Sequence, residues 1–308
     1  PAMSSLRRVL VTGATGFIGR RTLEPLLRRG FEVHAASRRP PQDAPAAVIH
    51  HACDLLDQEA RQALVQSVAA THLLHLAWFA EPGRFWKSPE NLRWTAASIE
   101  LTRVFAAHGG RRAVFAGTCA EYDWSETLCD EQRTPIRPQS LYGSCKAALW
   151  SVLQSAAPVL GITAGWGRLF FLYGEHEHPQ RVIPSVILAL LRDQPAVCTA
   201  GRQVRDFMYV GDVAQAYVSL LDSVVTGPVN IASGEAQPLA ETLTLLGQEL
   251  RKPHLVQLGA RPTPPHEPAV LRADISRLRD EVSFRPQVGL REGLQRTIAW
   301  WQAQTTGP

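Results

Sequence analysis

The organising stretch of this sequence is Val9-Leu10-Val11-Thr12-Gly13-Ala14-Thr15-Gly16-Phe17-Ile18-Gly19. It reads as a short apolar strand, a glycine-rich turn and the start of a helix, with Gly13, Gly16 and Gly19 in the spacing G-x-x-G-x-x-G. Glycines let the backbone turn tightly and approach a diphosphate, and a helix start directs free N–H groups and a positive dipole end toward it. Because a strand precedes the turn and a helix follows it, we predict a dinucleotide site here.

The composition suits a globular enzyme with a small anionic substrate. The chain has 308 residues, 45% of them hydrophobic, and a formal net charge of +4. No apolar run approaches the roughly 20 residues of a membrane span, so we expect no membrane association and a cytoplasmic location. Lys and Arg are dispersed, which argues against a nucleic-acid partner. The five cysteines are scattered without a C-x-x-C pair, which argues against both a disulfide framework and a metal site.

Strands and helices alternate through the first half of the chain. We predict strands over residues 31–36, 48–53, 73–77 and 113–116, and helices over residues 16–29, 57–70, 91–108 and 141–157. This alternation implies an α/β fold, with a parallel sheet covered by helices on both faces. Beyond residue 174 the pattern loosens into helices, short strands and proline-rich loops.

The end of the second predicted strand bears on the choice of dinucleotide. An acidic residue at this place accepts the ribose hydroxyls of NAD, whereas an arginine accommodates the extra phosphate of NADP. The chain has Ser37-Arg38-Arg39 and no carboxylate here. We therefore expect NADP(H) to be preferred and NAD(H) to be possible. The alternative is that Arg38 and Arg39 are ordinary loop cations.

Tyr142 and Lys146 lie four residues apart at the start of a predicted helix, so they share one helix face. An ammonium group beside a phenol favours the phenolate and lowers the tyrosine pKa toward neutrality. Such a pair can act as a general acid and base. A Y-x-x-x-K spacing by itself more often marks a solvated helix face than a catalytic pair.

Six motifs together carry a resemblance to a known family. They are TGATGFIG at residues 12–19, Asp54-Leu55, Thr118 four residues before Tyr122, Tyr142-Gly143-Ser144-Cys145-Lys146, Arg168 to Gly174, and Arg205 to Ala214. In this order they resemble the extended short-chain dehydrogenase/reductases, in the branch of sugar-nucleotide epimerases, dehydratases and reductases. The resemblance implies a Rossmann-type doubly wound sheet over residues 3–174, to which residues 201–225 return. It also implies a smaller mixed α/β substrate-binding lobe over residues 175–200 and 226–308.

The resemblance also implies roles for particular residues. The catalytic residues would be Thr118, Tyr142 and Lys146. The cofactor would be held by Gly13, Thr15, Gly16, Phe17, Ile18, Gly19, Ser37, Arg38, Arg39, Asp54, Leu55, Leu76, Ala77, Tyr142, Lys146 and Phe170. The substrate, a nucleotide-diphosphate sugar, would be held by Trp78, Thr118, Phe171, Arg181, Arg205 and Glu267. Relatives pair through helices equivalent to residues 91–108 and 142–157, which implies a homodimer.

Three positions depart from the family pattern, and they concern the type of reaction and the contacts with the substrate. The acidic pair that dehydratases carry after the threonine is replaced by Cys119-Ala120, which disfavours dehydration. Phe171 stands where epimerases often have an asparagine, and Pro264 where a substrate arginine is expected. We expect NADPH-dependent reduction of a keto group on a nucleotide-activated deoxysugar, with Tyr142 as the proton donor. The alternatives are an epimerase that forms a transient ketone and a non-catalytic dinucleotide sensor.

Three further groups of residues leave choices open. Glu175-His176-Glu177-His178 could bind a metal, but without further ligands a solvated loop is favoured. The aromatic residues around Trp78 and Trp86 could be packing residues or a wall of the sugar pocket. Cys119 and Cys145 are interpreted as small packing residues because neither has a paired histidine.

Overall fold

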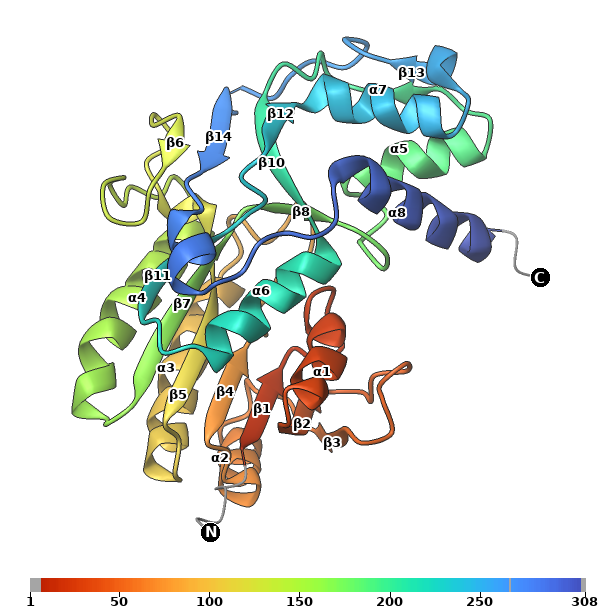
Figure 1. The fold of residues 1–308 in the computed structure, drawn as a ribbon. Helices are drawn as coiled ribbons and strands as arrows, with labels where there is room; N and C mark the ends of the chain where they lie inside the picture. Colours follow the sequence, from red (N-terminus) through yellow and green to blue (C-terminus); the bar gives the residue numbers. More distant parts are fainter. Residues whose placement is uncertain (1–6, 266, 306–308) are drawn as a thin grey trace.

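The computed structural model describes residues 7–265 and 267–305, and its larger part is a seven-stranded parallel sheet (Figure 1). The strand order is β11-β7-β5-β4-β1-β2-β3. The strands are β1 (Arg8–Thr12), β2 (Glu32–Ser37), β3 (Ile49–Ala52), β4 (His72–His75), β5 (Arg112–Thr118), β7 (Thr163–Leu169) and β11 (Gly227–Ile231). The doubly wound α/β prediction is therefore confirmed.

Helices cover both faces of this sheet. They are α1 (Gly19–Arg28), α2 (Gln58–Val68), α3 (Glu90–Ala107), α4 (Leu141–Val159) and α6 (Val210–Asp222). One face is covered by α1 and α6, which pack against each other, and the other by α2, α3 and α4. The predicted helices and strands of this part all occur, with ends that differ by up to three residues.

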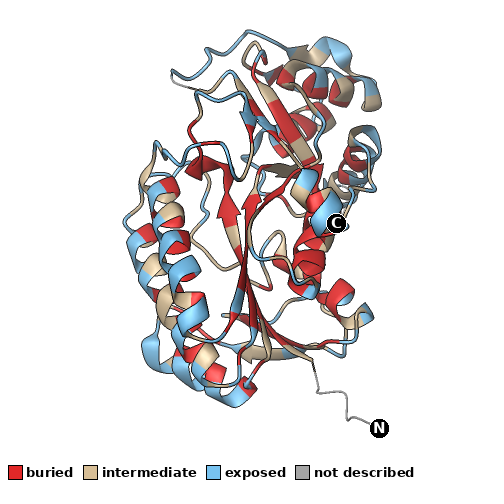
Figure 2. Ribbon diagram, turned by 60° about the vertical axis from the view of Figure 1, so that its left-hand side comes forward, coloured by how far each residue is buried: buried red, intermediate tan, exposed pale blue. Residues whose placement is uncertain are grey.

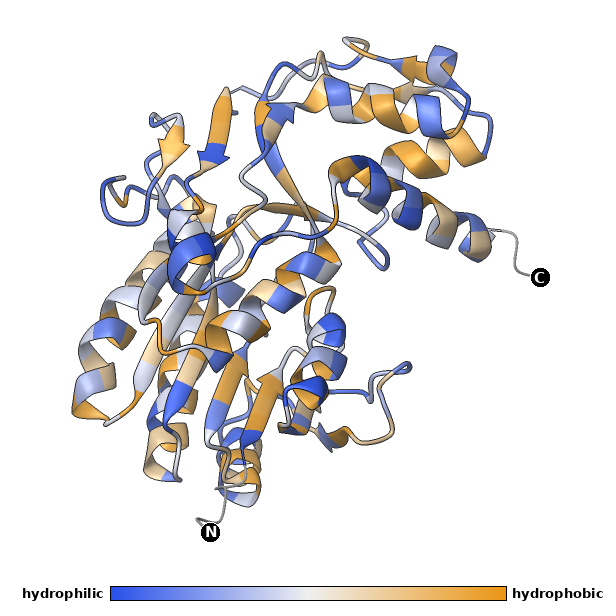
Figure 3. Ribbon diagram, viewed as in Figure 1, coloured by the Kyte–Doolittle hydropathy of each residue, from blue (hydrophilic) through white to orange (hydrophobic). Residues whose placement is uncertain are grey.

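Burial on two faces explains why the strands read as continuous apolar runs rather than as alternating patterns. Along β1, Val9 and Val11 enter the core beneath α1 and α6, whereas Leu10 enters the core on the opposite face. All three side chains are fully buried. Figure 2 shows this buried layer through the middle of the sheet, and in Figure 3 most of β1 has the colour of hydrophobic residues.

The second lobe stands above the carboxyl ends of the large sheet (Figure 1). Its sheet has the order β12-β10-β14-β6, with β8 beside β10, and a separate two-stranded sheet joins β13 and β9. The strands are β6 (Leu128–Cys129), β8 (Phe171–Tyr173), β9 (Ala196–Val197), β10 (Val204–Tyr209), β12 (Ala236–Pro238), β13 (Val256–Gln257) and β14 (Val270–Ala273). The helices are α5 (Val182–Leu191), α7 (Leu239–Glu249) and α8 (Leu290–Thr305).

The chain passes between the two lobes at places that differ from the prediction. Residues 226–308 were assigned to the second lobe, but β11 pairs in parallel with β7 and completes the large sheet. Residues 201–225 were expected to return to the first domain, but β10 lies in the smaller sheet and only α6 returns. Both strands are short and largely buried, and periodicity does not say which sheet such a strand joins.

Two expected absences can be compared with the described residues. Within residues 7–265 and 267–305, no helix is both long and apolar enough to cross a bilayer. The same residues contain no group of three or more His, Cys, Asp or Glu side chains arranged to hold a metal ion. All five cysteines are buried and free of disulfides.

A buried ion pair joins the ends of two central strands. The Glu121 carboxylate follows β5 and is fully buried, and it lies 2.8 Å from Nε of Arg168 on β7. It also accepts hydrogen bonds from the Trp166 indole and from the backbone N–H of Thr118. Both carboxylate oxygens are therefore used, which is what a charge inside a protein requires.

This pair extends into the second lobe through Tyr122 and Asn230. Arg168 donates to the Tyr122 hydroxyl, which donates in turn to Oδ1 of Asn230 on β11. The Asn230 amide donates to the backbone carbonyls of Cys129, on β6, and Asp274, next to β14. A single polar network thus connects β5, β7 and β11 to the smaller sheet.

We predict that Glu121→Gln lowers the free energy of unfolding by about 3–5 kcal/mol, because it leaves the Arg168 guanidinium buried without a counter-charge. Urea denaturation measures this change. Glu24→Gln is the control, since Glu24 forms an exposed pair with Arg28 that we expect to contribute less than about 1 kcal/mol. Equal losses in the two variants would contradict the importance of the buried pair.

Candidate active site

The glycine turn forms a cradle at the carboxyl end of β1. Gly13 has a positive φ of 69°, and a Cβ atom there would lie 2.8 Å from the backbone nitrogen of Ala77. A Cβ atom on Gly19 would lie 2.1 Å from the carbonyl oxygen of Gly13. Side chains are thus excluded from both positions, and α1 begins at Gly19 with its N–H groups directed into the turn. These residues fit the diphosphate of a dinucleotide.

The buried His75 helps to position the residues after β4, which lie next to the glycine turn. Nδ1 of His75 lies 2.7 Å from Oγ1 of Thr12, and Nε2 lies 2.8 Å from Oγ of Ser98. The Thr12 hydroxyl also accepts hydrogen bonds from the backbone N–H groups of Leu76 and Ala77. Burial lowers the pKa of His75 to about 3, so the ring is neutral. The sequence analysis missed this role because nothing local to His75 indicates its partners.

The structure brings Thr118, Tyr142 and Lys146 together at the carboxyl end of β5. Thr118 ends the strand, and Tyr142 and Lys146 lie in the first turns of α4, which Ser140 caps by accepting from the N–H of Gly143. A side-chain hydrogen bond joins Thr118 to Tyr142. The Lys146 ammonium donates to the carbonyl of Ala116 at 2.7 Å.

The electrostatics of the Tyr142–Lys146 pair differ from the expectation. Burial raises the pKa of Tyr142 above its usual range, although the hydrogen bond from Thr118 and the charge of Arg181 oppose this rise. Burial also lowers the pKa of Lys146 to about 7. The predicted lowering of the Tyr142 pKa by Lys146 is therefore wrong for this arrangement, in which the ammonium is directed to Ala116 and desolvation outweighs charge attraction.

Aromatic rings surround this centre. The ring of Tyr142 lies 4.9 Å from that of Phe85 and 5.8 Å from that of Trp86, both edge to face. Trp86 in turn contacts Trp124 at 6.2 Å, and the Trp78 ring lies 3.7 Å from Nζ of Lys146. Phe85 and Trp86 thus pack against the Tyr142 ring, and Trp78 packs against the Lys146 ammonium. Their role as a wall of a sugar pocket stays a prediction.

The residues expected to select the dinucleotide lie at the end of β2. The Ser37 hydroxyl donates to the carbonyl of Arg39 at 2.6 Å and lies 3.1 Å from Nε2 of His50. Both Arg38 and Arg39 are exposed. Next to β3, Asp54 is also exposed, and its carboxylate accepts from the N–H of Leu56.

The expected substrate residues separate into two groups. Arg205 on β10 is 3% exposed, pairs with Glu267 at 3.0 Å, and lies 5.3 Å from the ring of Phe171. Arg181 is exposed, and its guanidinium lies 5.5 Å from the ring of Phe85 and hence beside Tyr142. A diphosphate that reached Arg205 would therefore compete with the Glu267 carboxylate for the same guanidinium.

The loop after β8 is not the solvated segment that the sequence suggested. Glu175 and Glu177 are each 9% exposed. Glu175 accepts from the Tyr209 hydroxyl and lies 3.1 Å from Nη2 of Arg21. Burial raises the pKa of Glu177 to about 8. The error arose because a charged stretch between helices and strands usually faces water, and only the fold reveals what covers it.

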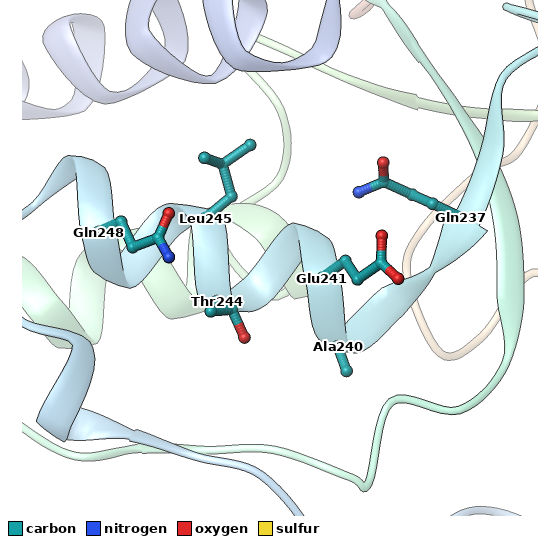
Figure 4. A pocket seen from close by; sticks show the side chains of 6 residues that line it. All are labelled: Gln237, Ala240, Glu241, Thr244, Leu245 and Gln248. Carbon is teal, nitrogen blue, oxygen red and sulfur yellow. The ribbon is translucent and has the colours of Figure 1, made fainter.

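Two surface hollows lie away from these residues. One, of about 420 Å³, is an open groove on α7, lined by Gln237, Ala240, Glu241, Thr244, Leu245 and Gln248 (Figure 4). The other, of about 380 Å³, lies between Phe207 on β10 and residues 285–290. Neither includes a residue of the centre around Tyr142.

The fold and this centre define a dinucleotide-dependent enzyme of the extended short-chain dehydrogenase/reductase type. Residues 9–232 match the NAD dependent epimerase/dehydratase family. Because this match covers more than half of the chain, the protein belongs to that family, and the resemblance inferred from its motifs is confirmed.

Individual relatives are similar along most of their length. UDP-glucose 4-epimerase from Streptomyces lividans is 26% identical, with 91% of each chain covered. UDP-glucuronic acid decarboxylase 1 from Danio rerio is 24% identical over 97% of this chain and 73% of the relative. Among solved structures, the Thermus thermophilus UDP-glucose 4-epimerase complex with NAD superimposes with a TM-score of 0.82 at 27% identity, covering 96% of this chain and 99% of that one.

We predict that Gly19→Ala abolishes measurable dinucleotide binding, because the new methyl group collides with the Gly13 carbonyl and opens the turn. Titration calorimetry with NADH and NADPH measures the binding, and circular dichroism checks that the variant is folded. Gly289→Ala is the control, since a Cβ atom there meets nothing within 4 Å. Retained affinity in Gly19→Ala would contradict the proposed cradle.

Proposed function

We propose that this enzyme is a nucleotide-sugar epimerase that works through a transient ketone. The proposal depends on one feature of the site: the hydroxyls of Thr118 and Tyr142 are hydrogen-bonded to each other, while Cys119 and Ala120 follow Thr118 in place of an acidic pair. Cys119 and Ala120 are buried, and burial raises the pKa of the Cys119 thiol. Neither residue therefore acts as a general acid or base. Relatives named as UDP-glucose 4-epimerases support this reaction.

The chain's own residues supply the proton chemistry of such a reaction. As a phenolate, which the positive charge of an oxidised nicotinamide would favour, Tyr142 takes a proton from the sugar hydroxyl as the ketone forms and returns it when the ketone is reduced on its other face. Thr118 hydrogen-bonds the same sugar oxygen, and Phe85 and Trp86 exclude water beside it. A nicotinamide ring, when bound, accepts and returns the hydride. The substrate diphosphate would meet Arg181 and Arg205.

We predict that Tyr142→Phe lowers the turnover of an epimerised UDP-sugar by about 10²–10⁴-fold, because it removes the group that exchanges the proton. The assay incubates UDP-glucose or UDP-galactose with enzyme and NAD, and separates the products by chromatography. Tyr173→Phe is the control, since that hydroxyl only donates to the carbonyl of Leu290. Unchanged turnover in Tyr142→Phe would refute the assignment, and net oxidation of NADPH without an epimer would favour a reductase.

The second candidate is an NADPH-dependent ketoreductase that acts on a nucleotide-activated keto-deoxysugar. It is favoured by Arg38 and Arg39, two exposed cations at the end of β2 in a stretch without a carboxylate. Two guanidinium groups there suit the 2′-phosphate of NADP. Net reduction consumes the reduced dinucleotide, so this reaction requires a cofactor that exchanges freely.

We predict that the double variant Arg38→Ala/Arg39→Ala weakens NADPH binding by about tenfold or more and changes NADH binding by less than about twofold. The reason is that only NADPH carries a phosphate for these guanidinium groups to pair with. Titration calorimetry measures both affinities, and Arg28→Ala serves as the surface-charge control. Equal losses for NADH and NADPH would mean that these arginines do not select the dinucleotide.

A homodimer is also part of the proposal. Apolar side chains are exposed on the two helices through which relatives were expected to pair, with Leu92 of α3 at 57% and Val152 of α4 at 45%. A neighbouring copy of these helices would cover them.

A further inference from the structure

The loop between β8 and α5 reaches from the glycine turn to the reaction centre. At one end, Arg20 of α1 lies 2.6 Å from Nδ1 of His176 and donates to the carbonyl of Thr15 inside the turn. The neighbouring Arg21 pairs with Glu175. This end of the loop is therefore fixed to the residues that start α1.

The other end of the loop lies beside Tyr142. Arg181 precedes α5, and its guanidinium is 5.5 Å from the ring of Phe85, which is itself 4.9 Å from the ring of Tyr142. The charge of Arg181 acts on both Tyr142 and Glu177. Glu177 therefore belongs to a loop whose two ends lie at the glycine turn and near Tyr142.

Glu177 has a carboxyl oxygen that no described group satisfies. The side chain is nine-tenths buried, and Oε2 has no hydrogen-bond partner in the described part of the chain. Glu175, on the same loop and equally buried, has both oxygens bound to Tyr209. A buried polar atom without a partner is costly, which points to a bound group as its missing partner.

We propose that Glu177 binds the nicotinamide half of the dinucleotide through its buried, unpartnered carboxyl oxygen. This half would run from a diphosphate at the glycine turn to a nicotinamide ring near Tyr142, and the loop that carries Glu177 connects the same two places. A protonated carboxyl both donates and accepts, which matches the carboxamide and hydroxyl groups of this half. A neutral group also avoids repulsion with the nearby diphosphate.

Arg181 is the charged group that acts most directly on Glu177. Arg181 favours its ionised form, whereas burial opposes that form more strongly and raises the pKa to about 8. Arg20 and Arg21 of α1 are engaged by His176 and Glu175, and His178 is exposed. Since the pKa is raised, the proton is held below about pH 8 and lost above it, so binding that needs the proton weakens as pH rises.

The test compares NADH with ADP, which lacks the nicotinamide half. We expect Glu177→Ala to weaken NADH binding by about 3–10-fold, the range of one hydrogen bond, and to leave ADP binding unchanged. Glu177→Gln should bind NADH within about twofold of the wild type at pH 7. Between pH 7 and 9 the wild type should lose more NADH affinity than Glu177→Gln, because titration of Lys146 is common to both proteins.

Glu131→Gln is the matched control. Burial raises the pKa of the Glu131 carboxyl to about 7, but this carboxyl accepts a hydrogen bond from the N–H of Asn230. Equal losses for NADH and ADP in Glu177→Ala would show a general effect on the loop and overturn the proposal. Unchanged NADH binding would overturn it as well. The inference rests on the dinucleotide site of the proposed function but not on its reaction, so failed epimerisation with intact NADH binding would leave it standing.

Discussion

The buried Glu121–Arg168 ion pair is the constraint on which the reaction centre depends. Burying two charged groups is tolerated only when their oxygen atoms and N–H groups are hydrogen-bonded. Here the hydrogen-bond partners come from the end of β5, from β7 and from Tyr122. One of them is the backbone N–H of Thr118, so the carboxylate that stabilises Arg168 also fixes the end of β5. Thr118 is thus positioned by a carboxylate in the turn that follows it, and Trp166 and Arg168 of β7 hold that carboxylate in place.

The same network explains how two lobes hold one site. From Arg168 the network continues through Tyr122 to Asn230. The Asn230 amide donates hydrogen bonds to the backbone carbonyls of Cys129 and Asp274, in and next to the smaller sheet. The second lobe supplies Arg205 and Glu267, and the large sheet supplies Thr118. Because hydrogen bonds rather than apolar contacts alone join them, the lobes are fixed in register at the place where substrate and cofactor would meet.

Local features of the sequence were enough to predict the glycine turn, the strands of the large sheet and the placement of Tyr142 and Lys146. The glycine spacing predicted the turn, and apolar runs predicted the central strands. Helical spacing placed Tyr142 and Lys146 on one helix face, whereas their catalytic role was implied by the family resemblance. The predictions that were wrong concern residues whose interaction partners are distant in sequence. The burial of Glu177 and the pairing of β11 with β7 are set by tertiary packing, and the pKa of Tyr142 follows desolvation rather than its neighbour four residues away.

Epimerase and reductase share the proton transfer at Tyr142 and differ in whether the dinucleotide leaves after one hydride transfer. That difference concerns the groups that cover the cofactor, not those that touch the sugar oxygen. The loop carrying Glu177 is fixed to α1 through Arg20 and Arg21 and to β10 through Tyr209, so opening it breaks several charge-assisted contacts at once. In the proposed function this loop would cover the nicotinamide end of the dinucleotide and slow its exchange, which suits an enzyme that returns the hydride to its own substrate. Arg38 and Arg39 are exposed at the end of β2. In the same proposal they would meet the adenosine end, and would select the dinucleotide without setting how long its nicotinamide end stays bound.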